Sequence, residues 1–184
     1  FGAEIVQANR AHPRQVAREW ALAYVETNAL INQLCRELIA TLAERGIAAA
    51  SEPATHNFDP ETLVSLWSHK SVAAIAGLGS FGLHRMLITE AGCAGRFGSL
   101  VLDSELAPSS PPPGQLPVRC AYFGGGDCAV CVDRCPTGAL TVDGLDKQLC
   151  YRWLLHVADC FQEMGLADVC GKCATGPCSL AEVV

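Results

Sequence analysis

The sequence has few basic residues and no cluster of them. It contains 13 Lys and Arg against 19 Asp and Glu, which gives a net charge of −6. No run of Lys or Arg is long enough to follow a phosphate backbone, so a dedicated nucleic-acid-binding function is not expected. Small molecules or basic protein surfaces are the expected partners.

Long apolar runs are also missing, although half of the 184 residues are apolar. Every stretch of about 18 residues contains a charge or a helix breaker, so no membrane span and no membrane partner are expected. No basic segment precedes an apolar one, as it would in a secretion signal. The chain begins at Phe1 instead of Met, so an upstream targeting segment would not be seen. The composition predicts a globular protein of one or two small domains.

Apolar spacing predicts a chain rich in helices. No Gly or Pro interrupts the segment between Pro13 and Gly46, where apolar residues recur at spacings of three and four. This pattern predicts one long amphipathic helix. Asp59 followed by Pro60 resembles a helix start, so a second helix is expected from there to Gly77. Further predictions are a helix over Leu83–Glu90, a helix over Lys147–Val157, and short strands at 47–50 and 99–102.

A proline-rich segment predicts the domain boundary. The run PSSPPPGQLP, which ends at Pro117, has no apolar periodicity and reads as an extended connector. We therefore expect an α-rich scaffold over residues 1–106, a connector over 107–118 and a cysteine-rich domain over 119–184. The predicted fold class is α+β.

Cysteine is the unusual residue of this chain. Nine of its 11 cysteines lie between Cys120 and Cys178, and the run Cys128-x2-Cys131-x3-Cys135-Pro136 is the central motif. Two-cluster ferredoxins contain C-x2-C-x2-C-x3-C-P, whose fourth cysteine binds the other [4Fe–4S] cluster. Gly125 stands where that run would have its first cysteine. Cys120 is the expected replacement, because three intervening glycines let the chain fold back.

These cysteines predict two [4Fe–4S] clusters and a function in electron transfer. One cysteine of the first half of the cysteine-rich segment is expected to bind the cluster of the second half, and one cysteine of the second half is expected to bind the cluster of the first. The predicted ligand sets are Cys120, Cys128, Cys131 and Cys178 for one cluster, and Cys135, Cys150, Cys170 and Cys173 for the other. Cys160 is left over.

Zinc and disulfides are the alternatives. Zinc on Cys128, Cys131, Cys170 and Cys173 would need an unusually long loop and would leave four other cysteines idle. Disulfides fit poorly with an odd number of cysteines, so a reducing compartment, the cytoplasm, is the expected location. Cys35 and Cys93 are expected to be ordinary small buried side chains.

A glycine motif between the two predicted helices has several interpretations. Gly77, Gly79 and Gly82 spell G-x-G-x-x-G, with Asp103 about 20 positions further on, as in dinucleotide-binding proteins. NAD(P) or flavin binding is the less favoured alternative, because no helix breaker separates Val72 from the helix expected to start near Pro60. The three glycines remain candidate cofactor contacts.

Several segments together resemble a known family. AGLGSFGLHRMLITEAGCAGRFGSLVLD, which ends at Asp103, the run RCPTGAL and the segment Leu145–Cys150 are similar to the epoxyqueuosine reductases and related reductive dehalogenases, most of all to short epoxyqueuosine reductase-like iron–sulfur proteins. The resemblance covers about residues 60–180. It implies that the glycine turn belongs to a corrinoid-binding domain, to which a two-cluster ferredoxin-like domain passes electrons. It also implies a ferredoxin or flavodoxin as electron donor, cobalamin as a further cofactor, and tRNA as the one nucleic acid to consider.

The chain departs from that family at two places. The family's Tyr-His pair and its Asp before the second helix are absent, since the corresponding segments are 26–28 and 51–56. His56, His69 and His84 lie in segments that would face a cofactor, but ordinary polar or capping roles are expected for them. The predicted function is single-electron transfer to an unidentified acceptor, with a cobalamin-dependent reductase acting beside the Gly77–Gly82 turn as the alternative.

Overall fold

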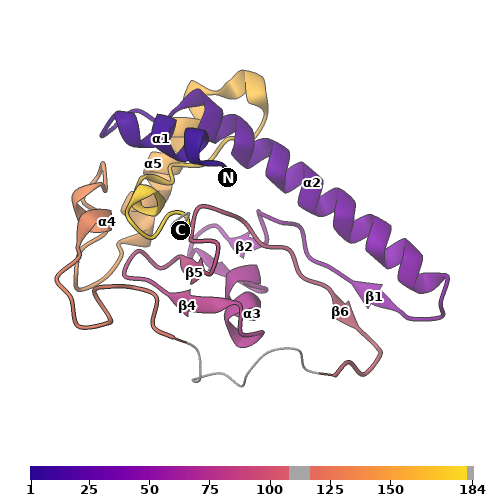
Figure 1. Ribbon diagram of the computed structural model, residues 1–184. Helices are drawn as coiled ribbons and strands as arrows, with labels where there is room; N and C mark the ends of the chain where they lie inside the picture. Colours follow the sequence, from indigo (N-terminus) through magenta and orange to yellow (C-terminus); the bar gives the residue numbers. More distant parts are fainter. Residues whose placement is uncertain (108–116, 182–184) are drawn as a thin grey trace. The chain divides into compact units, whose positions relative to one another are not determined.

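The computed structural model describes residues 1–107 and 117–181, which form two compact units (Figure 1). The first, here called the cysteine unit, consists of Phe1–Val25, Gly79–Gly95 and the described part of Pro117–Val184. The second unit consists of Glu26–Leu78 and the described part of Arg96–Leu116. The predicted connector 107–118 lies almost entirely outside the described residues, so a domain boundary there remains a prediction.

The cysteine unit combines short helices with one hairpin. Strands β4 (Gly79–Phe81) and β5 (Leu87–Thr89) pair antiparallel, with Gly79 opposite Thr89. Helix α5 begins after Asp146, whose side chain accepts a hydrogen bond from Leu149 N at 2.8 Å, and it confirms the predicted C-terminal helix. Helix α5 covers Lys147–Cys160. The other helical segments are α1 (Ala3–Ala11), α4 (Val130–Asp133), η1 (Gln162–Met164) and η2 (Lys172–Thr175).

The long predicted helix is confirmed as α2 (Arg18–Ala43), which starts in the cysteine unit and continues into the second unit. It ends before Gly46, whose φ of 76° is the left-handed conformation that commonly terminates helices. The remaining elements of the second unit are α3 (His69–Ile75) and two antiparallel pairs, β1 (Ala49–Ala50) with β6 (Val101–Leu102) and β2 (Phe58–Asp59) with β3 (Val64–Ser65). Helices with small antiparallel sheets confirm the α+β class.

The helix predicted to start at Pro60 is wrong in its first part. The Asp59 carboxylate accepts hydrogen bonds from Glu61 N at 3.1 Å and Thr62 N at 2.7 Å, as a helix cap would, but the chain then turns back into β3. The side chain therefore closes an Asx turn of a hairpin. The helix begins only at His69.

The helix predicted over Leu83–Glu90 is also wrong, because this segment contains β5. Gly82 N donates to Met86 O at 2.9 Å, which closes a turn between β4 and β5. Arg85 within the turn has a φ of 63°, which no helix allows. The β-branched residues Ile88 and Thr89 favour the strand that follows.

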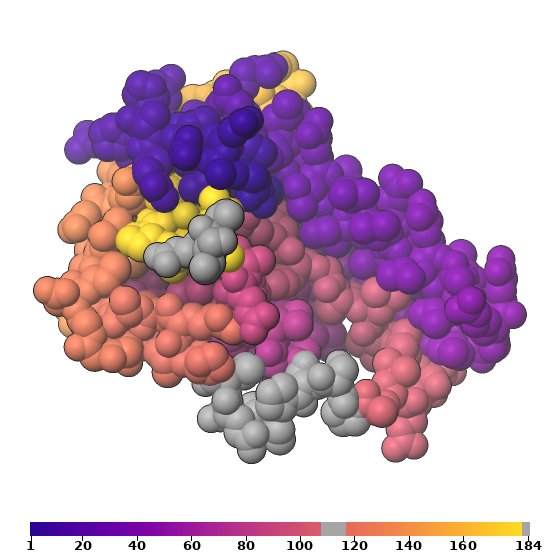
Figure 2. Space-filling view, viewed as in Figure 1, coloured from indigo at the N-terminus to yellow at the C-terminus, as the bar shows by residue number. Residues whose placement is uncertain are grey.

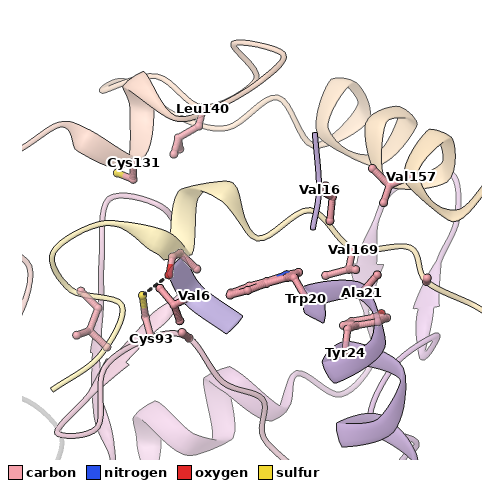
Figure 3. Packing of buried hydrophobic residues seen from close by; sticks show 14 of the residues in the cluster. Val6, Val16, Trp20, Ala21, Tyr24, Cys93, Cys131, Leu140, Val157 and Val169 are labelled. Carbon is pink, nitrogen blue, oxygen red and sulfur yellow. Dashed lines mark hydrogen bonds between the residues drawn. The ribbon is translucent and has the colours of Figure 1, made fainter. Parts of the chain in front are cut away.

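One hydrophobic core holds the cysteine unit together, and it includes cysteines (Figure 3). Trp20 and Tyr24 are buried at the start of α2, and the Tyr24 hydroxyl donates to Asp168 at 2.8 Å. Figure 3 shows Cys93 and Cys131 among the members of this core. Sulfur atoms and apolar side chains thus share one interior, and the cysteines are not confined to the surface.

A buried lysine joins the two ends of the described chain. Lys172, only 1% exposed, donates to His12 O at 2.7 Å, to Gln15 O at 2.6 Å and to Asn9 O. Asn9 in turn donates to Cys170 O at 2.9 Å. Figure 2 shows the N-terminal residues, in indigo, against the yellow C-terminal segment. The loop of Cys170 and Cys173 is therefore fixed to α1.

Among the described residues, no helix combines the length and the apolar character that crossing a bilayer requires.

Replacing Lys172 with Met tests the role of this ammonium group. We expect the free energy of unfolding to fall by about 1–3 kcal/mol, because three carbonyl groups lose their donor. Denaturant unfolding of the full chain, followed by tryptophan fluorescence, measures the change. Lys147→Met, at an exposed position on α5, is the control and should stay within about 0.5 kcal/mol of wild type. Equal stability of the two variants would contradict a structural role for Lys172.

Candidate metal centre

All eight predicted cluster ligands belong to the cysteine unit. They come from the loop before α4, from α4 and the turn after it, from α5, and from the segment around η2. Cys160 is exposed at the end of α5, and its sulfur lies 4.0 Å from His156 Nε2. Cys35 is buried in α2, within the second unit.

Three sulfurs of the first predicted set interact electrostatically. Burial raises the pKa of Cys131 to about 11, and nearby negative charge on Cys178 and Cys120 adds to this effect. Cys120 Sγ also accepts a hydrogen bond from Leu83 N at 3.5 Å. The place of Cys128 in this set rests on its spacing from Cys131.

The four sulfurs of the second predicted set interact electrostatically as well. Burial raises the pKa of Cys150 to about 11, with contributions from the charges of Cys170 and Cys135. The pKa of Cys173 is also raised, by burial first and then by Cys170 and Cys150. Negative charge on Cys170 and Cys135 therefore opposes ionisation of both Cys150 and Cys173.

Backbone donors reach the sulfur of Cys135. Leu140 N donates to it at 3.4 Å. Burial alone would raise the pKa of Cys135, but hydrogen bonds from Leu140 and Thr137 outweigh burial and lower the pKa below its ordinary value. Such N–H groups stabilise a thiolate, which is the form that binds metals.

The two predicted sets also interact with each other. Cys131 of the first set and Cys135 of the second both contribute to the raised pKa of Cys173.

The donor set fits iron–sulfur clusters. Burying several thiolates together is costly unless positive charge compensates for them, and metal binding supplies that charge. Trp153 Nε1 is buried and has no hydrogen-bond partner among the described residues, although it lies close enough to Cys170 to offset part of the effect of burial on that pKa. An inorganic sulfide or a metal-bound thiolate would be a suitable acceptor.

The structure adds two residues that the sequence did not predict at this site, Cys93 and His84. Cys93 Sγ lies 3.9 Å from Cys178 Sγ, and His84 Nε2 lies 3.3 Å from the same sulfur. The three ligand atoms all lie within 4.8 Å of one another. Neither residue belongs to a cysteine motif, so local spacing gave no signal for this group.

Cys178 is the ionised member of this group. Hydrogen bonding from Cys93, followed by that from His84, lowers the pKa of Cys178 to about 5. The same hydrogen bond raises the pKa of Cys93, and burial raises it further. Near neutral pH, Cys178 is therefore a thiolate and Cys93 a thiol.

Backbone pairing brings these residues together. Cys93 N donates to Cys178 O at 3.0 Å, and Ala94 N donates to Ser179 O at 2.9 Å. Gly92 permits this approach, since a Cβ there would overlap the backbone of Ser179 and Leu180. Cys93 Sγ also lies 3.9 Å from Ala174 O, the contact drawn as a dashed line in Figure 3.

The glycine motif has packing roles. Gly77 follows α3 with a φ of 81°. A Cβ at Gly79 would overlap the carbonyl group of Ile88 in the hairpin, and a Cβ at Gly82 would lie 2.7 Å from His84 Cε1. Dinucleotide binding needs a strand before the glycines and a helix after them, whereas here a helix precedes and a hairpin follows. The glycine motif therefore lacks the strand–turn–helix order on which the NAD(P) or flavin alternative depends.

His69 has a structural environment within the second unit. Its Nδ1 lies 2.8 Å from Ser99 Oγ, and its Nε2 lies 3.0 Å from Pro53 O. Both ring nitrogens are thus occupied by the surrounding chain, in agreement with the ordinary polar role predicted for this residue.

Comparisons with known proteins support a partial relationship. No protein-family model matches the chain, and no solved structure gives a significant match. Proteins named epoxyqueuosine reductase from Bacillus anthracis and Bacillus cereus are each 36% identical to it over 88 residues, and one from Staphylococcus aureus is 36% identical over 89 residues. These matches cover 47% of this chain but only 21% of each relative, so the chain aligns with about a fifth of the length of the curated relatives. About half of the chain is therefore related to epoxyqueuosine reductases.

Proposed function

We propose that this chain is an iron–sulfur electron-transfer protein that binds two [4Fe–4S] clusters. The observation that carries the proposal is that seven of the eight predicted ligands take part in electrostatic interactions between sulfurs of the same predicted set. The eighth, Cys128, lies three positions before Cys131. In two-cluster ferredoxins the same spacing places two thiolates on one cluster.

The proposed ligand sets exchange one cysteine between the two halves of the sequence. Cys135 ends the first motif, but its charge raises the pKa of Cys150 and Cys173. Cys178 ends the last motif, but its charge raises the pKa of Cys131. Such an exchange is the pattern of ferredoxins with two clusters. It supports a ferredoxin-like arrangement of the cysteine unit.

Single electrons would enter from a ferredoxin or flavodoxin type donor and pass from one cluster to the other. The partial relationship to epoxyqueuosine reductases supports a reductive reaction. Hydrogen bonds to the sulfurs and burial of the clusters would set their potentials. We propose a reducing compartment such as the cytoplasm, where free thiols persist.

A cobalamin-dependent reductase acting beside the Gly77–Gly82 turn has less support. Gly79 and Gly82 are required by contacts within the hairpin and with His84, so the motif can be explained without a ligand. The electron-transfer function is therefore preferred.

Purification without oxygen tests the proposed cofactors. We expect about eight iron atoms and about eight sulfides per chain, as two [4Fe–4S] clusters require. Cobalamin should be added afterwards and its visible spectrum recorded. An unchanged corrinoid spectrum supports a pure electron carrier, and a shifted one supports the reductase. Bound zinc without sulfide would contradict the proposal.

The ligand sets make a second prediction. Replacing Cys135 with Ala should remove about half of the iron, because one cluster loses a ligand while the other keeps four. Cys160→Ala is the matched control and should retain the wild-type iron content, since Cys160 is exposed and belongs to neither group. Iron and sulfide analysis, together with electron paramagnetic resonance of the reduced protein, measures both. Iron loss in the control would show that the sets are wrong.

A further inference from the structure

His84 is buried within the cysteine unit and aims one ring nitrogen at a predicted cluster ligand. Its side chain is 4% exposed, and its Nε2 lies 3.3 Å from Cys178 Sγ. Neither the cysteine motifs nor the proposed electron path uses this residue. Its burial therefore calls for a separate explanation.

The other ring nitrogen determines which proton His84 carries. Met86 N donates to His84 Nδ1 at 3.0 Å. A backbone N–H can only donate, so Nδ1 must accept and carries no proton. In the neutral ring the proton then resides on Nε2, which faces the Cys178 sulfur. His84 is thus a hydrogen-bond donor to this thiolate.

The same argument shows that His84 is not a metal ligand. A histidine that binds metal through Nε2 needs a lone pair there and usually donates its Nδ1–H to an acceptor. In this chain Nδ1 faces a donor, which is the opposite arrangement. The compact group of His84, Cys93 and Cys178 is therefore a hydrogen-bonded thiolate and not a three-ligand site for a single ion.

Gly82 makes room for the ring. A Cβ at this position would lie 2.7 Å from His84 Cε1 and 3.1 Å from Nε2. Only a residue without a side chain leaves the imidazole where it reaches Cys178. The last glycine of the G-x-G-x-x-G motif thus has a role linked to the cluster ligand.

We propose that His84 is a positioning residue that donates its Nε2–H to the Cys178 thiolate and raises the reduction potential of the cluster bound there. The inference rests on the proposed function, since it requires Cys178 to hold a cluster. A donor to a ligand sulfur stabilises the reduced cluster, which carries the additional negative charge. Cys93, as a thiol at 3.9 Å, supplies a second donor.

Redox titration of the anaerobically purified full chain, followed by electron paramagnetic resonance, tests this role. In His84→Phe, one of the two clusters should become about tenfold harder to reduce, a shift of about 59 mV to lower potential for a one-electron couple. The other cluster and the iron content should stay as in wild type. His84→Gln retains an amide donor and should recover part of the shift.

Gly82→Ala provides an independent variant that keeps the histidine. The added methyl group should displace the ring and lower the same potential. Gly95→Ala, where a Cβ meets nothing within 4 Å, is its control. His12→Phe, at an exposed position, is the control for His84→Phe. Both controls should leave both potentials unchanged.

The possible outcomes separate the inference from the proposed function. Two clusters with unmoved potentials in His84→Phe and Gly82→Ala would overturn the inference alone. Loss of about half the iron in His84→Phe, with Gly82→Ala and the controls intact, would identify His84 as a ligand and also overturn it. A wild-type protein without clusters would overturn the proposed function and the inference together.

Discussion

The structure depends on one electrostatic constraint, the burial of many thiols in one small volume. Burial and mutual repulsion raise the pKa of Cys131, Cys150 and Cys173, so these groups do not ionise readily on their own. Iron would supply the positive charge that turns this unfavourable grouping into a set of ligands. The cysteine unit would therefore gain much of its stability from its cofactors, as small metal-binding domains commonly do.

The rest of the cysteine unit brings distant segments to these sulfurs. Lys172 and Asn9 tie the loop of Cys170 to α1, and Arg10 donates to Thr175 O at 2.7 Å. On the other side, the strand-like pairing at Cys93 holds the last described residues against the hairpin. A ligand loop fixed from both sides keeps its shape before metal arrives, which lowers the entropy that cluster binding must overcome.

Local patterns in the sequence predicted the long helices and the candidate ligands but not the long-range contacts. Helix α2 followed from its apolar period, and α5 was predicted over Lys147–Val157. The helix start predicted at Asp59 was wrong because the same side-chain hydrogen bonds occur in a helix cap and in a hairpin turn. His84 is 94 positions from Cys178, and nothing in its neighbourhood marks it as a partner of that sulfur. Sequence spacing reveals ligands that share a motif, whereas residues that support them from elsewhere become visible only in the fold.

The most direct test of this account is a crystal structure of anaerobically purified protein with anomalous scattering recorded at the iron edge. Two separate peaks are expected in the cysteine unit, one bonded to Cys178 and the other to Cys135. Hydrogen bonding between His84 and Cys178 should persist beside the first peak. A single tetrahedral ion held by Cys128, Cys131, Cys170 and Cys173, without iron, would contradict the central claim.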